Sequence, residues 1–138
     1  MTEPQAIQTT TPPHDDALVD QLLTYDEEYR LDCKRLAGKL ASALETVVAF
    51  ANSDGGVLLL GLEDPRKAKG RARVYGVEES PMGLDELRRS VETRITPELP
   101  GVSWRSLGCT LRDGQSGSIV VVSVPKSLKV HSIVGDGT

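Results

Sequence analysis

The chain has 138 residues and a formal net charge of -4, and its composition is that of a folded domain rather than a fibrous or disordered protein. Aromatic residues make up only 4% of it, so we expect a core of Val, Leu, Ile and Ala. No apolar run reaches the roughly 20 residues of a membrane-spanning helix, and the N-terminus lacks a secretory pattern. The sequence therefore predicts a cytoplasmic protein without a membrane partner.

The N-terminal segment, residues 1–16, is predicted to be a disordered tail, because it is rich in Thr, Pro and Gln and cannot bury enough apolar surface. Residues 17–138 form the predicted domain. Its first helix would be capped by Asp15 or Asp16 and end near Tyr25. Residues 1–20 hold four acidic and no basic residues, so the rest of the chain is neutral overall.

The centre of the chain predicts a strand, a helix and a second strand. Apolar residues alternate with polar ones over residues 29–34, which indicates a half-exposed strand. Helical spacing of apolar residues from Leu40 to Ala51 predicts a helix, which the Asn52–Gly56 turn ends. The continuous apolar run 57–62 predicts a buried strand. By alternation, one face of that strand would carry Val57, Leu59, Gly61 and Glu63.

The second half predicts a helix and a hairpin. A loop over residues 64–73 and a short strand over 74–77 precede a helix that begins at Ser80-Pro81 and ends at Pro97. Residues 102–111 and 118–124 then form an antiparallel hairpin. Residues 131–138 have the pattern of one half of another hairpin, so we expect the domain to be truncated at its C-terminus.

Isolated Cys and His residues carry no metal or nucleotide motif. Cys33 and Cys109 are expected to be free, buried side chains, since neither has a partner at metal spacing. His14 and His131 also lack such partners. The glycine-rich phosphate loop that ends in Gly-Lys-Ser/Thr is absent, which argues against nucleotide binding of that type.

One set of motifs carries a family resemblance. It consists of Glu27, the strand end Asp32-Cys33-Lys34, the segment Ala-Phe-Ala-Asn-x-x-Gly-Gly at 49–56, and Gly61-Leu62-Glu63-Asp64. Together these resemble the Schlafen/AlbA-like domain family over about residues 25–138. The resemblance implies an α+β fold, with two main helices packed on a mixed, largely antiparallel sheet. It also implies a nucleic-acid-binding module of bacterial transcriptional regulators, related to the Schlafen ribonucleases.

The ribonuclease branch of that family suggests a catalytic interpretation. Its three carboxylates match Glu27, Asp32 and Glu63, which would then hold Mg or Mn, with Lys34 on the phosphate. The alternative is structural: Glu27 and Glu28 are solvated charges, and Asp32 pairs with Lys34 or Arg30.

A second interpretation is binding without catalysis, to DNA or RNA. Basic residues can neutralise backbone phosphates, whereas so few aromatic residues do not favour a base-stacking platform. The predicted phosphate contacts are Lys34, Arg66, Lys67, Lys69, Arg71 and Arg73. Most of these residues lie in one basic loop, residues 66–73, and the alternative is that this loop is a solvated, flexible hairpin.

The turn residues Asn52, Gly55 and Gly56, together with Gly61, are predicted to be structural. The alternative is that backbone N–H groups of the turn bind an anion.

A third function is a protein-interaction or homo-oligomerisation domain that uses an open sheet edge.

Overall fold

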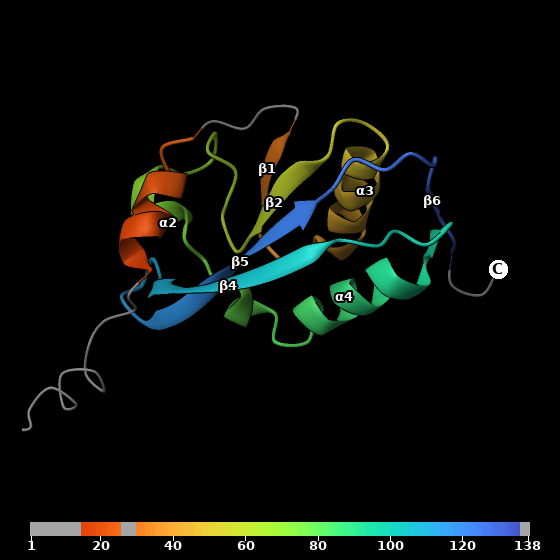
Figure 1. Cartoon of the computed structure of the whole chain (residues 1–138). Helices are drawn as coiled ribbons and strands as arrows, with labels where there is room; N and C mark the ends of the chain where they lie inside the picture. The colour runs from red at the N-terminus through yellow and green to blue at the C-terminus, as the bar shows by residue number, and fades with distance from the viewer. Residues whose placement is uncertain (1–14, 26–29, 136–138) are drawn as a thin grey trace, which may run out of the picture.

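The computed structural model describes residues 15–25 and 30–135, so Glu27 and most of the predicted tail lie outside the described residues. The domain bounds stay a prediction. The helices and strands follow the order α2 (Asp16–Leu22), β1 (Leu31–Lys34), α3 (Leu40–Ala51), β2 (Gly56–Leu60), α4 (Gly83–Thr93), β3 (Ile95–Thr96), β4 (Ser103–Thr110), β5 (Ser116–Val124) and β6 (Ser132–Ile133) (Figure 1). Two 3-10 helices, Gly70–Arg73 and Val77–Glu79, lie between β2 and α4.

Four of the strands form the main sheet, in the order β1-β2-β5-β4. The pair β1 and β2 is parallel, while β5 is antiparallel to both β2 and β4. Parallel neighbours need a long crossover connection, and α3 provides it. The prediction of an α+β fold with a mixed, largely antiparallel sheet is confirmed.

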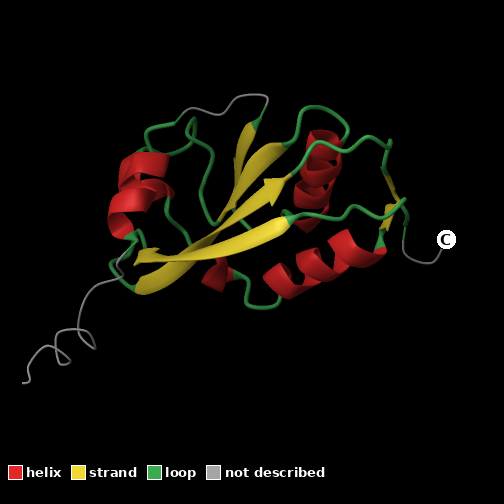
Figure 2. Cartoon of the chain, in the orientation of Figure 1, coloured by secondary structure: helices red, strands yellow, loops and turns green. Residues whose placement is uncertain are grey.

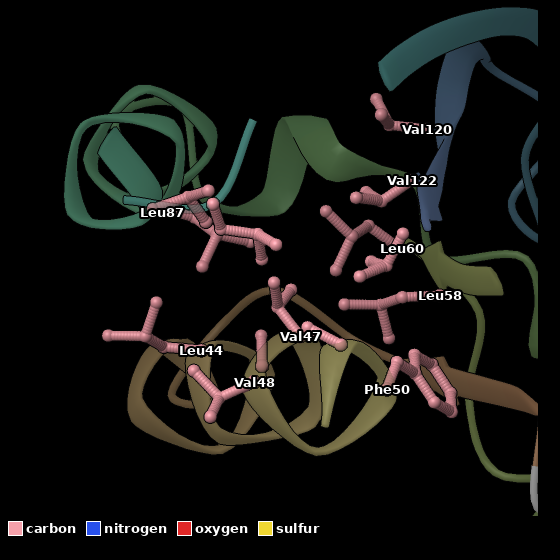
Figure 3. Packing of buried hydrophobic residues seen from close by; sticks show 14 of the residues in the cluster. Leu44, Val47, Val48, Phe50, Leu58, Leu60, Leu87, Val120 and Val122 are labelled. Carbon is pink, nitrogen blue, oxygen red and sulfur yellow. The ribbon is translucent and has the colours of Figure 1, made fainter. Parts of the chain in front are cut away.

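The two faces of the sheet pack against different helices. Leu58 and Leu60 face α3 and α4: Figure 3 shows them beside Val47 of α3, in the same cluster as Leu87 of α4. Leu59, which points the other way, belongs to a second cluster with Val19 of α2. The two main helices therefore cover one face, as predicted, and the shorter α2 covers part of the other.

The predicted turn after α3 is present, and its glycine has a steric reason. Gly55 has a φ of +80°, and a Cβ there would lie 2.7 Å from the carbonyl oxygen of Val124. The N–H groups of Asn52, Ser53 and Gly55 bond to carbonyls of α3. The anion-binding alternative for this turn therefore finds no support.

The Asn52 side chain also has a structural role. Its amide donates to the carbonyl of His131 at 2.9 Å and accepts from the His131 N–H at 2.8 Å. Asn52 thus pairs with the C-terminal segment as a neighbouring strand would.

Gly61 breaks the predicted alternation of the second strand. Its φ is +101°, and a Cβ would lie 3.0 Å from the backbone of Gly76. The strand β2 therefore ends at Leu60, and the prediction that Gly61 and Glu63 continue one strand face is wrong.

Three predictions for shorter elements are also wrong. Residues 74–77 form no strand, because Val74 makes only an isolated bridge with Leu62. The half hairpin expected over residues 131–138 is wrong in its partner: within residues 131–135 the strand β6 is present, and it pairs with β3 in a separate small sheet (Figure 2). Neither Asp15 nor Asp16 caps α2, because both carboxylates accept hydrogen bonds from backbone N–H groups of β4.

Candidate nucleic-acid interface

The carboxyl ends of the parallel strands β1 and β2 meet at one small pocket of about 120 Å³. The loops that follow these two strands supply the rest of its wall, an arrangement typical of ligand sites beside parallel strands. Five cationic and three acidic side chains line it, so we call it the cationic pocket. Its lining residues are Asp32, Cys33, Lys34, Arg35, Lys39, Glu63, Asp64, Arg66 and Lys67.

Asp32 and Lys34 form an ion pair at the end of β1. The Lys34 Nζ lies 2.9 Å from the Asp32 Oδ2, and both side chains are mostly buried. The hydroxyl of Thr46, on α3, donates a longer hydrogen bond of 3.4 Å to the same oxygen. The structural alternative, in which Asp32 pairs with Lys34, is therefore present.

Glu63 reaches the same pocket from the loop after β2 and is also engaged. Its Oε2 accepts the N–H of Asp64 at 2.9 Å, and its Oε1 lies 3.5 Å from the Arg35 guanidinium. Arg35 binds Glu79 more closely, at 2.7 Å. The hydrogen bonds to Glu79 are the main reason that the pKa of Arg35 is raised above its usual value.

Arg66 forms a local pair with Asp64. Its guanidinium donates to the Asp64 carboxylate at 2.7 to 3.2 Å, and this bonding holds the pKa of Asp64 well below its ordinary value. The Arg66 side chain is nevertheless 83% exposed. Exposed pairs of this kind exchange partners at little cost, so Arg66 stays available to a phosphate.

The prediction that Arg73 contacts phosphate is wrong, because Arg73 is only 1% exposed. Its guanidinium donates to the carbonyls of Glu63 and Leu23 and to the Cys33 sulfur. Arg71 is also engaged, with ion pairs to Asp16 and Asp20 and a hydrogen bond to the carbonyl of Thr110. We leave both arginines out of the candidate interface.

Three lysines around the pocket differ from these arginines. Lys39, Lys67 and Lys69 are exposed, and none has an ion pair within residues 15–25 and 30–135.

The sequence interpretation missed two lining residues of the pocket, Lys39 and Arg35. The available signal was the strand–helix–strand order, since a parallel crossover brings the loop before its helix to the same sheet edge as the loop after the second strand.

The described residues do not by themselves form a metal site. Asp32 and Glu63 line one pocket, but each is paired with a cation. Among residues 15–25 and 30–135, no three acidic, His or Cys side chains converge to hold an ion. We therefore derive no step that runs through a metal.

These features define an α+β domain with a cationic pocket at a parallel strand pair. The family model "Schlafen, AlbA_2" matches residues 27–136, so the chain belongs to the Schlafen AlbA_2 family, as its motifs predicted. This membership supports a nucleic-acid-related role. A search of curated proteins found no match.

A solved structure supports the fold. The chain resembles the DIP2311 protein from Corynebacterium diphtheriae with a TM-score of 0.53 and 22% sequence identity. The match covers 87% of this chain and 23% of that chain, so this chain spans less than a quarter of the DIP2311 protein. At this identity the likeness shows the fold alone.

No helix in the described part of the chain is both long and apolar enough to cross a bilayer. Homo-oligomerisation through a sheet edge stays a prediction.

Proposed function

We propose that this domain binds nucleic acid by contacting backbone phosphates at the cationic pocket. The observation that carries this proposal is the pair of exposed lysines Lys39 and Lys67 in the pocket wall, with Lys69 two residues further along the chain; none of the three forms an ion pair within residues 15–25 and 30–135. Phosphate neutralisation by such residues dominates the affinity of many nucleic-acid-binding proteins.

The crossover helix adds to the positive potential. Lys39 is the N-cap residue of α3, and the first turn of this helix contains no acidic residue. A helix N-terminus carries a partial positive charge and unpaired N–H groups, both of which favour an anion. The helix end and the lysine charges therefore act on the same small pocket, whose size suits one phosphate group.

The proposal is tested by fluorescence anisotropy with labelled DNA and RNA at several salt concentrations. The double variant Lys39→Gln/Lys67→Gln should bind more weakly, and its plot of log affinity against log salt should be shallower by about 2, or about 1 for each lost contact. Lys129→Gln is the matched control, because Lys129 is exposed and lies beyond the other end of α3. Absence of salt-sensitive binding by the wild type, or unchanged binding by the double variant, would refute the proposal.

A second candidate function is a ribonuclease that acts on structured RNA. Asp32, Lys34 and Glu63 line one pocket, which favours this candidate, while the cation pairing of both carboxylates counts against it. Incubation of tRNA with the protein and Mg²⁺ or Mn²⁺ tests it. Cleavage that disappears in Asp32→Asn supports it, whereas no cleavage, or equal cleavage by this variant, contradicts it.

A further inference from the structure

Tyr75 lies against two guanidinium groups from different parts of the chain. The Arg35 guanidinium carbon lies 3.7 Å from the centre of the ring, and that of Arg112 lies 4.3 Å from it. Each guanidinium is attracted electrostatically by the ring of Tyr75. Arg35 lines the cationic pocket, and the tyrosine therefore connects this pocket to Arg112.

Arg35 and Arg112 differ in their electrostatic surroundings. Arg35 is paired with Glu79 and Glu63, whereas Arg112 is exposed and has no ion pair within residues 15–25 and 30–135. A guanidinium that stacks by its face keeps the N–H donors at its edge available. Arg112 is thus an ordered cation whose charge is not neutralised by these residues.

The loop that carries Arg112 is itself fixed in place. The Arg112 N–H donates to the carbonyl of Val74 at 2.8 Å, and the Leu111 N–H donates to Gln115 at 2.8 Å. The Leu111 side chain packs closely over Gly76 and Gly117, where an added Cβ would lie within 2.7 Å of it. The position of Arg112 relative to Tyr75 is therefore held by backbone and core contacts.

We propose that Arg112 forms a second phosphate contact, so that the protein binds the sugar–phosphate backbone of a double-stranded nucleic acid at two places. The first place is the cationic pocket, and the inference rests on the function proposed for it. Two cations on rigid segments suit a duplex, because its phosphates have regular positions. Tyr75, the aromatic side chain beside both arginines, already has a guanidinium from each of them over its ring, so stacking of a single-stranded base on this ring is not favoured.

The test compares Arg112→Gln with Arg105→Gln by anisotropy on a labelled duplex and on one of its strands. Arg105 is an exposed arginine of β4, and about 17 Å of strand separate it from Thr110, where the hairpin loop begins. Loss of one phosphate contact should reduce the salt slope by about 1. The affinity ratio between 50 and 200 mM salt should then fall roughly threefold to fourfold in Arg112→Gln, and not in Arg105→Gln.

Arg112→Lys adds a test of the stacked geometry. It keeps the charge and loses the planar fork, so it should bind less tightly than the wild type and more tightly than Arg112→Gln. Urea unfolding of each variant checks that the fold is intact.

The possible outcomes separate the two proposals. If the wild type binds neither the duplex nor the single strand, the function proposed for the pocket fails. If the wild type binds and Arg112→Gln behaves like Arg105→Gln, the Arg112 contact is refuted while the pocket proposal stands. Tighter binding to the single strand than to the duplex would refute the choice of partner.

Discussion

Gly55, in the turn between α3 and β2, is a position where one added methyl group meets backbone atoms. A Cβ would lie 2.7 Å from the Val124 oxygen and 2.8 Å from the Lys126 nitrogen, in addition to the cost of a φ of +80°. We expect Gly55→Ala to lose more than about 3 kcal/mol in unfolding free energy. Gly114→Ala is the control, because its φ is +87° and nothing lies near its Cβ, so it should lose only about 1 to 2 kcal/mol. Equal losses in urea unfolding would contradict the steric argument.

Arg73 is a structural cation, although it belongs to the most basic segment of the sequence. Replacing it by Met leaves the partly buried carbonyl of Glu63 without its donor at 2.8 Å, and removes the donors to the Leu23 carbonyl and the Cys33 sulfur. We expect Arg73→Met to lower the unfolding free energy by roughly 2 to 4 kcal/mol. Lys69→Met, four residues earlier and exposed, should change it by less than about 0.5 kcal/mol. A stable Arg73→Met protein with weakened duplex binding would show that Arg73 acts on the ligand instead.

At the scale of the element, α2 is attached to the edge strand β4 by a carboxylate. Asp16 accepts the Thr110 N–H at 2.7 Å and the Thr110 hydroxyl at 2.8 Å, and it pairs with Arg71. Burial raises the pKa of Asp16, but the hydrogen bonds from Thr110 and the charge of Arg71 together outweigh it. The pKa therefore lies below the ordinary value of 3.8.

The lowered pKa of Asp16 gives its contribution a definite pH dependence. A carboxylate with a depressed pKa in the folded state stabilises the fold above its unfolded pKa, and this stability is lost as pH falls through the folded pKa. Asp16→Asn should therefore be less stable than the wild type at neutral pH, and the difference should narrow between about pH 5 and pH 2. Urea midpoints across this range measure it. A difference that stays constant across this range would contradict this account.

At the scale of the whole molecule, the accessibility of the two cysteine thiols to a reagent measures whether the folded domain opens. Cys33 in β1 and Cys109 in β4 are buried in the α2-side cluster, on the two edge strands of the main sheet. Burial raises the pKa of the Cys109 thiol to about 11, which keeps it protonated and unreactive at neutral pH. We expect no labelling of either thiol by a small alkylating reagent in the native protein and labelling of both in guanidinium. Rapid native labelling would reveal local opening of an edge strand.

The sequence pattern predicted the elements that have long apolar periods and missed those that depend on tertiary contacts. The helix Leu40–Ala51 was found because many of its residues repeat one period, and the strand predicted over 118–124 was found because its apolar run is continuous. The pairing of β3 with β6 was missed because strands of two residues carry no period. Within the basic loop, the pattern could not separate Lys67 from Arg73. That distinction depends on the folded structure, in which Arg73 is the last residue of the 3-10 helix Gly70–Arg73 and its side chain donates to the Glu63 carbonyl.

At the candidate site, too, the sequence pattern found the residues that belong to a motif and missed those that only tertiary contacts bring there. Asp32, Lys34 and Glu63 were placed together by the family motifs, and the structure brings them to one pocket. Lys39 and Arg112 were missed, since Lys39 stands beside no motif and Arg112 reaches this surface only through its contact with Tyr75.

The separation of the side chains into two clusters has a consequence for how substitutions combine. Leu58 and Leu59 are neighbours in β2, yet they point into different clusters that lie on opposite faces of the sheet. Energetic effects of substitutions without shared partners usually add, whereas those of touching residues do not. We therefore expect a substitution in the layer under α2 and one in the layer under α3 and α4 to lower the unfolding free energy by nearly the sum of their separate effects, so that a change in one layer needs no compensating change in the other.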